Sequence, residues 1–210
     1  MISRRDLLKG FGVAGAAAVT PASPAAAAAQ QRAASAPAAR EALESLTAAE
    51  SDILEAITAR LIPSDAAGPG AKEARAAHYI DRALAGQLAS SRAAYAAGLA
   101  SLDAYARTSK GSTFAQLSAP DQDAVLSDVE ANRASGFTPS GAAFFTMVRA
   151  HTIEGTFSDP YYGGNADFAG WDLIGYPGVR VSVVPAEQQL NAVKPNHKSA
   201  YDFGMFAKQR

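Results

Sequence analysis

The sequence predicts an all-α protein, a compact bundle of about five helices followed by a long irregular C-terminal segment. Three observations support this. Hydrophobic residues make up 48% of the chain, but alanine supplies much of that share and aromatics only 8%, which favours closely packed helices over a thick β-sandwich. Apolar residues recur at helical spacing from residue 46 to residue 156. Beyond residue 157, turn residues and aromatics replace the periodicity.

The N-terminal 29 residues contain a pair of adjacent arginines followed by an apolar run, Phe11 to Val19. The run is well short of the roughly 20 residues that span a bilayer, and Ala27-Ala28-Ala29 offers a cleavage site. We predict a signal segment at residues 1–29, read by the twin-arginine translocase, and a periplasmic location. Its recognition residues are Ser3, Arg4, Arg5, Leu7, Leu8 and Lys9. Residues 30–45 are rich in Ala and Pro and are predicted to be a tether.

Three helices are expected in the first half of the remaining chain. The first runs from the capping box that starts at Thr47 to Pro63, which stops it. The second repeats an apolar stripe after a Gly-Pro-Gly loop, from Ala77 to Gly86. The third runs from Ser91 to the stop signal Lys110-Gly111. Each carries one apolar face, so each is expected to pack against the others.

Two further helices complete the predicted helical domain, residues 46–156. The fourth starts at Ser118, with Pro tolerated in its first turn, and is closed by Gly136. The fifth opens at Thr138-Pro139 and continues to Gly155. Its wide apolar face, which includes Phe144, predicts that it is the central and most buried helix.

Composition limits the chemistry of this chain. It has no cysteine, which excludes disulfides, thiolate-bound iron–sulfur clusters and the attachment site of c-type haem. We therefore expect no redox cofactor in this chain and place any electron carrier on another one. The formal net charge is −1, so a nucleic-acid partner is not expected.

Candidate catalytic residues are few. None of the three histidines has a metal-ligand spacing to another, and no dinucleotide, phosphate or nucleophile-elbow motif occurs. His151 and Glu154 share a helix face, so they could ligate a metal or exchange a proton, although a helix-terminal hydrogen bond is the simpler interpretation. Two alternatives stay open: an independent periplasmic enzyme using His151, Glu154 and Tyr162, and a helical protein that binds a small ligand.

The irregular segment, residues 157–210, is rich in aromatics and turn residues. Such a segment inside a domain is usually either disordered or functional, and its aromatic content favours docking on a partner. We expect Phe157 and Trp171 to pack onto the fifth helix. The predicted partner-binding residues are Tyr161, Tyr162, Asn165, Tyr176, Pro177, Tyr201, Phe203 and Phe206.

Several motifs resemble the gluconate 2-dehydrogenase subunit 3 family over roughly residues 46–178. The C-terminal block is the most specific part. The motifs are Ile62-Pro63-Ser64-Asp65, Gly68-Pro69-Gly70-Ala71, Tyr79-Ile80-Asp81, Phe114-Ala115-Gln116-Leu117-Ser118, His151-Thr152-Ile153-Glu154-Gly155, Ser158 to Asn165 and Gly170 to Gly178.

The resemblance implies a non-catalytic small subunit of a heteromeric dehydrogenase. The catalytic subunit would be a glucose–methanol–choline-type flavoprotein that carries FAD and oxidises a sugar, sugar acid or polyol. A cytochrome c subunit with haem c often accepts the electrons, and partner subunits can associate such a complex with the inner membrane. The small subunit would be needed for the maturation, stability and twin-arginine export of the catalytic subunit. The resemblance transfers no catalytic role to His151 or Glu154.

Overall fold

The structure, a computed structural model, describes residues 41–189 and 194–206 of the chain. Within these residues it contains six α-helices, α2 to α7, joined by turns and short 3-10 helices. The described residues form no β-strand, and one isolated β-bridge pairs Asp65 with Gly68. The predicted all-α fold is confirmed. The predicted signal segment and residues 30–40 of the predicted tether lie outside the described residues.

The first three helices begin and end close to the predicted positions. α2 (Ala48–Leu61) starts at Thr47, whose hydroxyl accepts from the Glu50 amide at 3.3 Å while the Glu50 carboxylate accepts from the Thr47 amide at 2.8 Å. This reciprocal pair satisfies two amides that a helix start leaves unpaired. α3 (Ala76–Ala85) and α4 (Arg92–Lys110) follow, and α4 ends at Gly111, where φ is +79°.

The remaining helices differ from the predicted ones at their ends. α5 (Ala119–Glu130) stops before Gly136, because a turn through Asn132, with φ at +57°, already ends it. α6 (Gly141–Phe157) starts at Ser140, whose hydroxyl accepts from the Ala143 amide, and not at Thr138-Pro139. It also continues through Gly155. The six-residue helix α7 (Ala169–Ile174) was not predicted, because it is too short to show a period.

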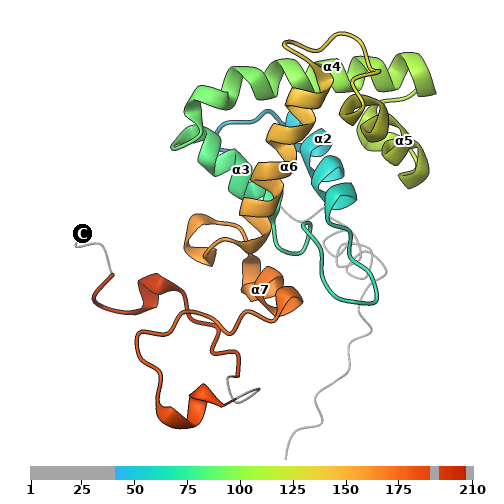
Figure 1. The fold of residues 1–210 in the computed structure, drawn as a ribbon. Helices are drawn as coiled ribbons and strands as arrows, with labels where there is room; N and C mark the ends of the chain where they lie inside the picture. The colour runs from blue at the N-terminus through green and yellow to red at the C-terminus, as the bar shows by residue number, and fades with distance from the viewer. Residues whose placement is uncertain (1–40, 190–193, 207–210) are drawn as a thin grey trace, which may run out of the picture. The chain divides into compact units, whose positions relative to one another are not determined.

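α6 is the central helix, as predicted. It packs against α2, α3, α4 and α5, with α7 near its C-terminal end (Figure 1). Its buried face includes Phe144, Phe145 and Val148. Glycines permit the close approaches, because a Cβ at Gly98 of α4 would overlap the Phe144 ring and one at Gly155 would lie 2.9 Å from the Ala76 carbonyl oxygen of α3. Helix packing in this body therefore depends on small residues at the crossings.

The N-terminal edge of the described region is anchored by a buried acid. Asp81 on α3 is 1% exposed. Its carboxylate accepts from the amides of Glu44 at 2.7 Å, Ser45 at 3.0 Å and Leu46 at 2.7 Å. Three amide donors compensate the buried charge, so the chain leading into α2 is fixed to α3. No helix in the described part of the chain is both long and apolar enough to cross a membrane.

Candidate interaction surface

A buried asparagine organises the turn that follows α6. Asn165 is fully buried, with φ at +44°. Its Nδ2 donates to the Ser158 carbonyl at 2.8 Å, and its Oδ1 accepts from the amides of Gly170 at 2.8 Å and Trp171 at 3.3 Å. It therefore joins the end of α6 to the start of α7. Asn165 was predicted to bind a partner, but its side chain has no exposed surface in this chain and instead holds the turn together.

Two glycines and a tryptophan complete this turn. A Cβ added at Gly164 or Gly170 would overlap a carbonyl oxygen in the last turn of α6, so only glycine lets the chain lie so close. Trp171 is 5% exposed and its Nε1 donates to the Phe157 carbonyl at 2.8 Å. The predicted packing of Trp171 onto the fifth helix is confirmed at the C-terminal end of α6, whereas Phe157, expected to pack onto that helix, is its last residue. The turn is a rigid base for the side chains that point outward from it.

Three tyrosines meet on this base and form what we call the tyrosine cluster: the exposed Tyr161 and Tyr162 and the half-buried Tyr201. Tyr161 and Tyr162 are 43% and 41% exposed. The rings of Tyr161 and Tyr201 stack with centroids 3.6 Å apart, and the hydroxyls of Tyr162 and Tyr201 are hydrogen-bonded at 2.9 Å. This hydrogen bond raises the pKa of Tyr201 to about 12. The cluster brings together three of the predicted partner-binding residues from two segments.

Asp159 holds the two segments of the tyrosine cluster together. Its carboxylate accepts from the Tyr161 amide at 2.9 Å on one side. On the other side it accepts from the Ser199 hydroxyl at 2.6 Å and the Ala200 amide at 2.8 Å. Asp159 was not among the predicted site residues, although the Asp-Pro pair at this position is a turn signal. Its long-range partners could not be read from the sequence.

The other predicted partner-binding residues are dispersed. Tyr176 is 40% exposed and packs edge-on against Trp171, with centroids 4.7 Å apart. Pro177 is half-buried, and its carbonyl accepts from the Asn196 amide at 3.0 Å. Phe203 is half-buried near Lys198, whereas Phe206 is 49% exposed. These residues line the same C-terminal part of the chain but do not join the tyrosine cluster in any ring contact among the described residues.

The residues after Gly178 form a C-terminal arm, defined as residues 179–189 and 194–206. His197 secures it to α7: its Nε2 lies 2.8 Å from the Asp172 Oδ1, and its ring stacks on Phe168 with centroids 4.9 Å apart. Nearby, the Val179 amide donates to the Lys198 carbonyl at 3.1 Å. The arm is therefore attached to the body at several points. His197 had no predicted role, since its partner Asp172 lies 25 residues away and no local pattern pairs the two.

His151 and Glu154 belong to a separate network between α6 and its neighbours. The Nδ1 of His151 is hydrogen-bonded to the Tyr95 hydroxyl at 2.9 Å, and the Tyr79 hydroxyl donates to Glu154 at 3.2 Å. Burial lowers the pKa of His151, partly opposed by Glu154, and burial raises the pKa of Tyr79 to about 12. No hydrogen bond between described residues joins His151, Glu154 and Tyr162 to one another. The arrangement connects helices and gives no support to an acid–base site.

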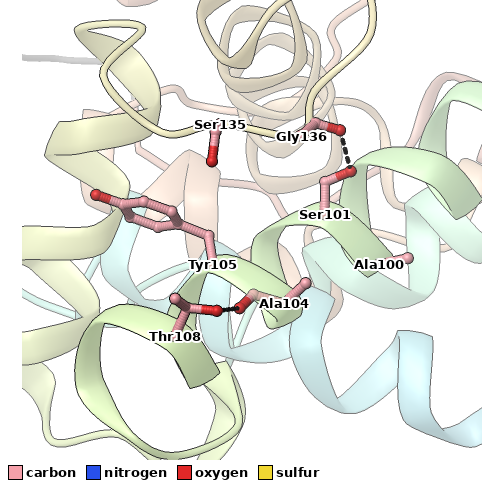
Figure 2. A pocket seen from close by; sticks show the side chains of 7 residues that line it. All are labelled: Ala100, Ser101, Ala104, Tyr105, Thr108, Ser135 and Gly136. Atoms are coloured by element: carbon pink, nitrogen blue, oxygen red, sulfur yellow. Dashed lines mark hydrogen bonds between the residues drawn. The ribbon is translucent and has the colours of Figure 1, made fainter.

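The described surface has shallow pockets lined by helix residues. One pocket, of about 450 Å³, lies between α4 and the turn at Gly136 and is open to solvent (Figure 2). Small side chains line most of it, and the hydroxyl of its one aromatic residue, Tyr105, already donates to Asp128 at 2.9 Å. Among the described residues, no group of three or more His, Cys, Asp or Glu could hold a metal ion. The hydroxyls of Ser101 and Thr108 also donate to main-chain carbonyls, so most of the polar groups that line the pocket are already used within the protein.

Two family models match the chain. The model of gluconate 2-dehydrogenase subunit 3 matches residues 48–178, from the first residue of α2 to Gly178, shortly after the end of α7. The model of the twin-arginine translocation pathway signal sequence matches residues 1–21. Comparisons with curated proteins and with solved structures found no match.

These matches define the class of protein as an exported accessory subunit of a dehydrogenase. The chain belongs to the gluconate 2-dehydrogenase subunit 3 family. The resemblance found in the sequence is thereby confirmed. The matched region contains Tyr161 and Tyr162, whereas the C-terminal arm, with Tyr201, lies beyond it.

Proposed function

We propose that this chain is the non-catalytic small subunit of a heteromeric flavin-dependent sugar or polyol dehydrogenase. It binds the catalytic flavoprotein, stabilises it during maturation and takes it across the cytoplasmic membrane to the periplasm. FAD belongs to the catalytic subunit, and haem c to a cytochrome c subunit where one is present. The observation that carries this proposal is the tyrosine cluster. Tyr161 and Tyr162 are exposed, and hydrogen bonds to Asp159 hold the two segments of the cluster together.

The geometry of the cluster suits protein binding. Tyrosines offer large amphipathic contact areas and are enriched at interface hot spots. A free tyrosine on a surface loses rotamer freedom when a partner covers it, and that loss weakens binding. Stacking on Tyr201 and the Asp159 hydrogen bonds already fix Tyr161 and its neighbour, so little freedom remains to be lost. The tyrosine cluster is therefore preorganised for binding.

The export signal supports the second part of the proposal. The twin-arginine signal stands on a chain that the family assigns to a dehydrogenase complex. The twin-arginine pathway carries folded cargo, so a partner without a signal of its own crosses the membrane while bound to this subunit. The flavoprotein is thus assembled with its cofactor and this subunit in the cytoplasm, and the complex works in the periplasm.

The test is co-expression of this chain with the catalytic subunit of its complex, followed by cell fractionation. The double substitution Arg4→Lys and Arg5→Lys preserves the charge but removes the arginine pair that the translocase reads. We expect both subunits and the dehydrogenase activity to remain in the cytoplasm. Normal periplasmic activity in the double variant would contradict the escort role.

A second measurement separates this proposal from an independent enzyme. The purified chain alone is expected to give a helical circular dichroism spectrum, no visible absorbance and no dehydrogenase activity. The complex is expected to show the flavin spectrum. A stoichiometric chromophore or activity in the isolated chain would assign the chemistry to this subunit instead.

A further inference from the structure

Two rings of the tyrosine cluster lie flat on one another. Tyr161 and Tyr201 stack with ring centroids 3.6 Å apart and ring planes 21° apart. Tyr162 meets both of these rings edge-on, at 5.4 Å from Tyr161 and 6.0 Å from Tyr201. The faces of Tyr161 and Tyr201 are therefore in van der Waals contact, and a reaction between the two rings requires only small movements.

Main-chain hydrogen bonds hold the two stacked rings in place. The Asp159 carboxylate accepts from the Tyr161 amide on one segment and from the Ala200 amide on the other. The Tyr201 amide donates to the Ser199 hydroxyl at 3.0 Å. The two rings come from segments far apart in the sequence, yet the folded chain keeps them face to face. A reaction between them gains from this fixed proximity, as an intramolecular reaction does.

The hydroxyl of Tyr201 has a neighbour that can take part in proton transfer. It lies 2.9 Å from the Tyr162 hydroxyl, and this hydrogen bond raises the pKa of Tyr201 to about 12. The phenol of Tyr201 therefore stays protonated at neutral pH. Removal of one electron from a phenol makes its hydroxyl strongly acidic, and the exposed Tyr162 then gives the proton a path to water.

Exposure and ring contacts distinguish this pair from the other tyrosines of the chain. Tyr161 is 43% exposed, so an oxidant in solution can reach it. Tyr79 and Tyr95 are 5% and 0% exposed. Tyr176 is 40% exposed, but its ring packs against Trp171 and not against a tyrosine. Among the described residues, tyrosine rings thus contact one another in the tyrosine cluster alone.

The composition gives such a pair a role that cysteines often have. The chain has no cysteine, and its signal sequence directs it out of the cytoplasm, where disulfides would otherwise be expected to form. Coupled tyrosines are another covalent cross-link that oxidation can make. A link between residues 161 and 201 would attach the C-terminal arm covalently to the turn after α6.

We propose that Tyr161 and Tyr201 are a site of oxidative cross-linking, at which the two rings are joined as dityrosine. Each phenol loses one electron to the oxidant and one proton from its hydroxyl, which leaves two phenoxyl radicals. The radicals couple through a new carbon–carbon bond between ring positions ortho to the hydroxyls. Those two carbons then lose their hydrogens as protons, and the two oxygens take up protons, so both rings become aromatic phenols again.

In total, two electrons and two protons leave the protein. The oxidant is hydrogen peroxide, acting through a haem peroxidase. It accepts the two electrons and two protons and becomes two molecules of water. The inference goes beyond the proposed function, because the cross-link requires the folded chain and the oxidant but no partner subunit.

The test treats the purified full-length chain with hydrogen peroxide and a haem peroxidase, at a low protein concentration that disfavours links between molecules. We expect dityrosine fluorescence and a monomer whose mass is lower by two hydrogen atoms. Trypsin places Tyr161 in the peptide of residues 150–180 and Tyr201 in that of residues 199–208, so mass spectrometry should find these two peptides joined. If Tyr161 and Tyr201 stay unlinked under conditions that couple N-acetyltyrosine, the inference is overturned.

Matched variants identify the reacting pair. Tyr161→Phe and Tyr201→Phe keep a ring at each position but remove the phenol, and each should lower the yield of the link within one chain by about 10-fold or more. Tyr176→Phe, which removes an exposed tyrosine outside the cluster, should match the unsubstituted chain. Tyr162→Phe leaves the stacked pair in place and should still give the link between residues 161 and 201.

Circular dichroism shows whether each variant keeps its helical fold. Two results would overturn the assignment to the stacked pair. One is a link that is lost in Tyr162→Phe but kept in Tyr161→Phe, which would identify the hydrogen-bonded pair, Tyr162 and Tyr201, as the reacting one. The other is a product made of cross-linked dimers with no link within one chain, which would show that the stack does not direct the coupling.

Discussion

Replacing Asn165 tests whether the turn after α6 depends on one side chain. Asn165→Gly removes three hydrogen bonds, at 2.8, 2.8 and 3.3 Å, and leaves buried amides and a carbonyl unpaired. At about 1 kcal/mol for each, the free energy of unfolding should fall by about 3 kcal/mol. Asn165→Ala should lose roughly 1 kcal/mol more, because φ at this position is +44° and alanine is strained there.

The assay is urea unfolding of the purified chain, followed by circular dichroism and by the fluorescence of Trp171, the one tryptophan in the sequence. For a chain of this size, a loss of 3 kcal/mol lowers Tm by about 6 to 12 °C. Asn132→Gly is a matched control, since this exposed left-handed asparagine makes one side-chain hydrogen bond, with the Gly141 amide at 3.0 Å. It should lose about 1 kcal/mol. Equal losses for Asn165→Gly and this control would refute the reasoning.

Three further predictions concern packing, pH and binding. Gly98→Ala should lower the free energy of unfolding by about 1 to 3 kcal/mol through its clash with Phe144, whereas Gly204→Ala, which meets open space, should not; urea unfolding checks both. Burial holds the pKa of His151 below 6.5, so the unfolded chain takes up this proton first and stability falls as the pH drops below 6.5. His151→Gln should flatten that slope in unfolding curves recorded between pH of about 5 and 7. Tyr162→Ala should weaken binding of the catalytic subunit about 10-fold or more with the helical spectrum unchanged, and unchanged affinity in a pull-down would remove this residue from the interface.

Local signals explain how much of the fold was predictable. The capping box at Thr47 and the glycine stop at residue 111 act over one helical turn, so the first three helices were found with nearly correct ends. The start of α6 was misplaced because two start signals stand side by side, Thr138-Pro139 and Ser140, and only the tertiary structure selects the second. α7 contains six residues, fewer than two turns, and gives no readable period.

The candidate site was harder to predict, because its geometry depends on contacts between distant residues. The exposure of Tyr161 and Tyr162 followed from the turn residues around them. Asn165 lies among the same turn residues, yet its side chain is buried and hydrogen-bonds three main-chain groups. These groups meet only because Gly164 and Gly170 let the chain lie against α6. Tyr201 reaches the cluster across 39 residues, a pairing that no local pattern encodes.

The Asp81 anchor fixes the point at which the chain enters the helical body. Three amides, from Glu44 to Leu46, donate to one carboxylate on α3. A replacement of residues 1–40 by an affinity tag or another leader leaves these donors and their acceptor in the sequence. Exchanging the leader is therefore a direct way to hold the subunit in the cytoplasm, and to measure its effect on folding of the partner separately from its effect on export.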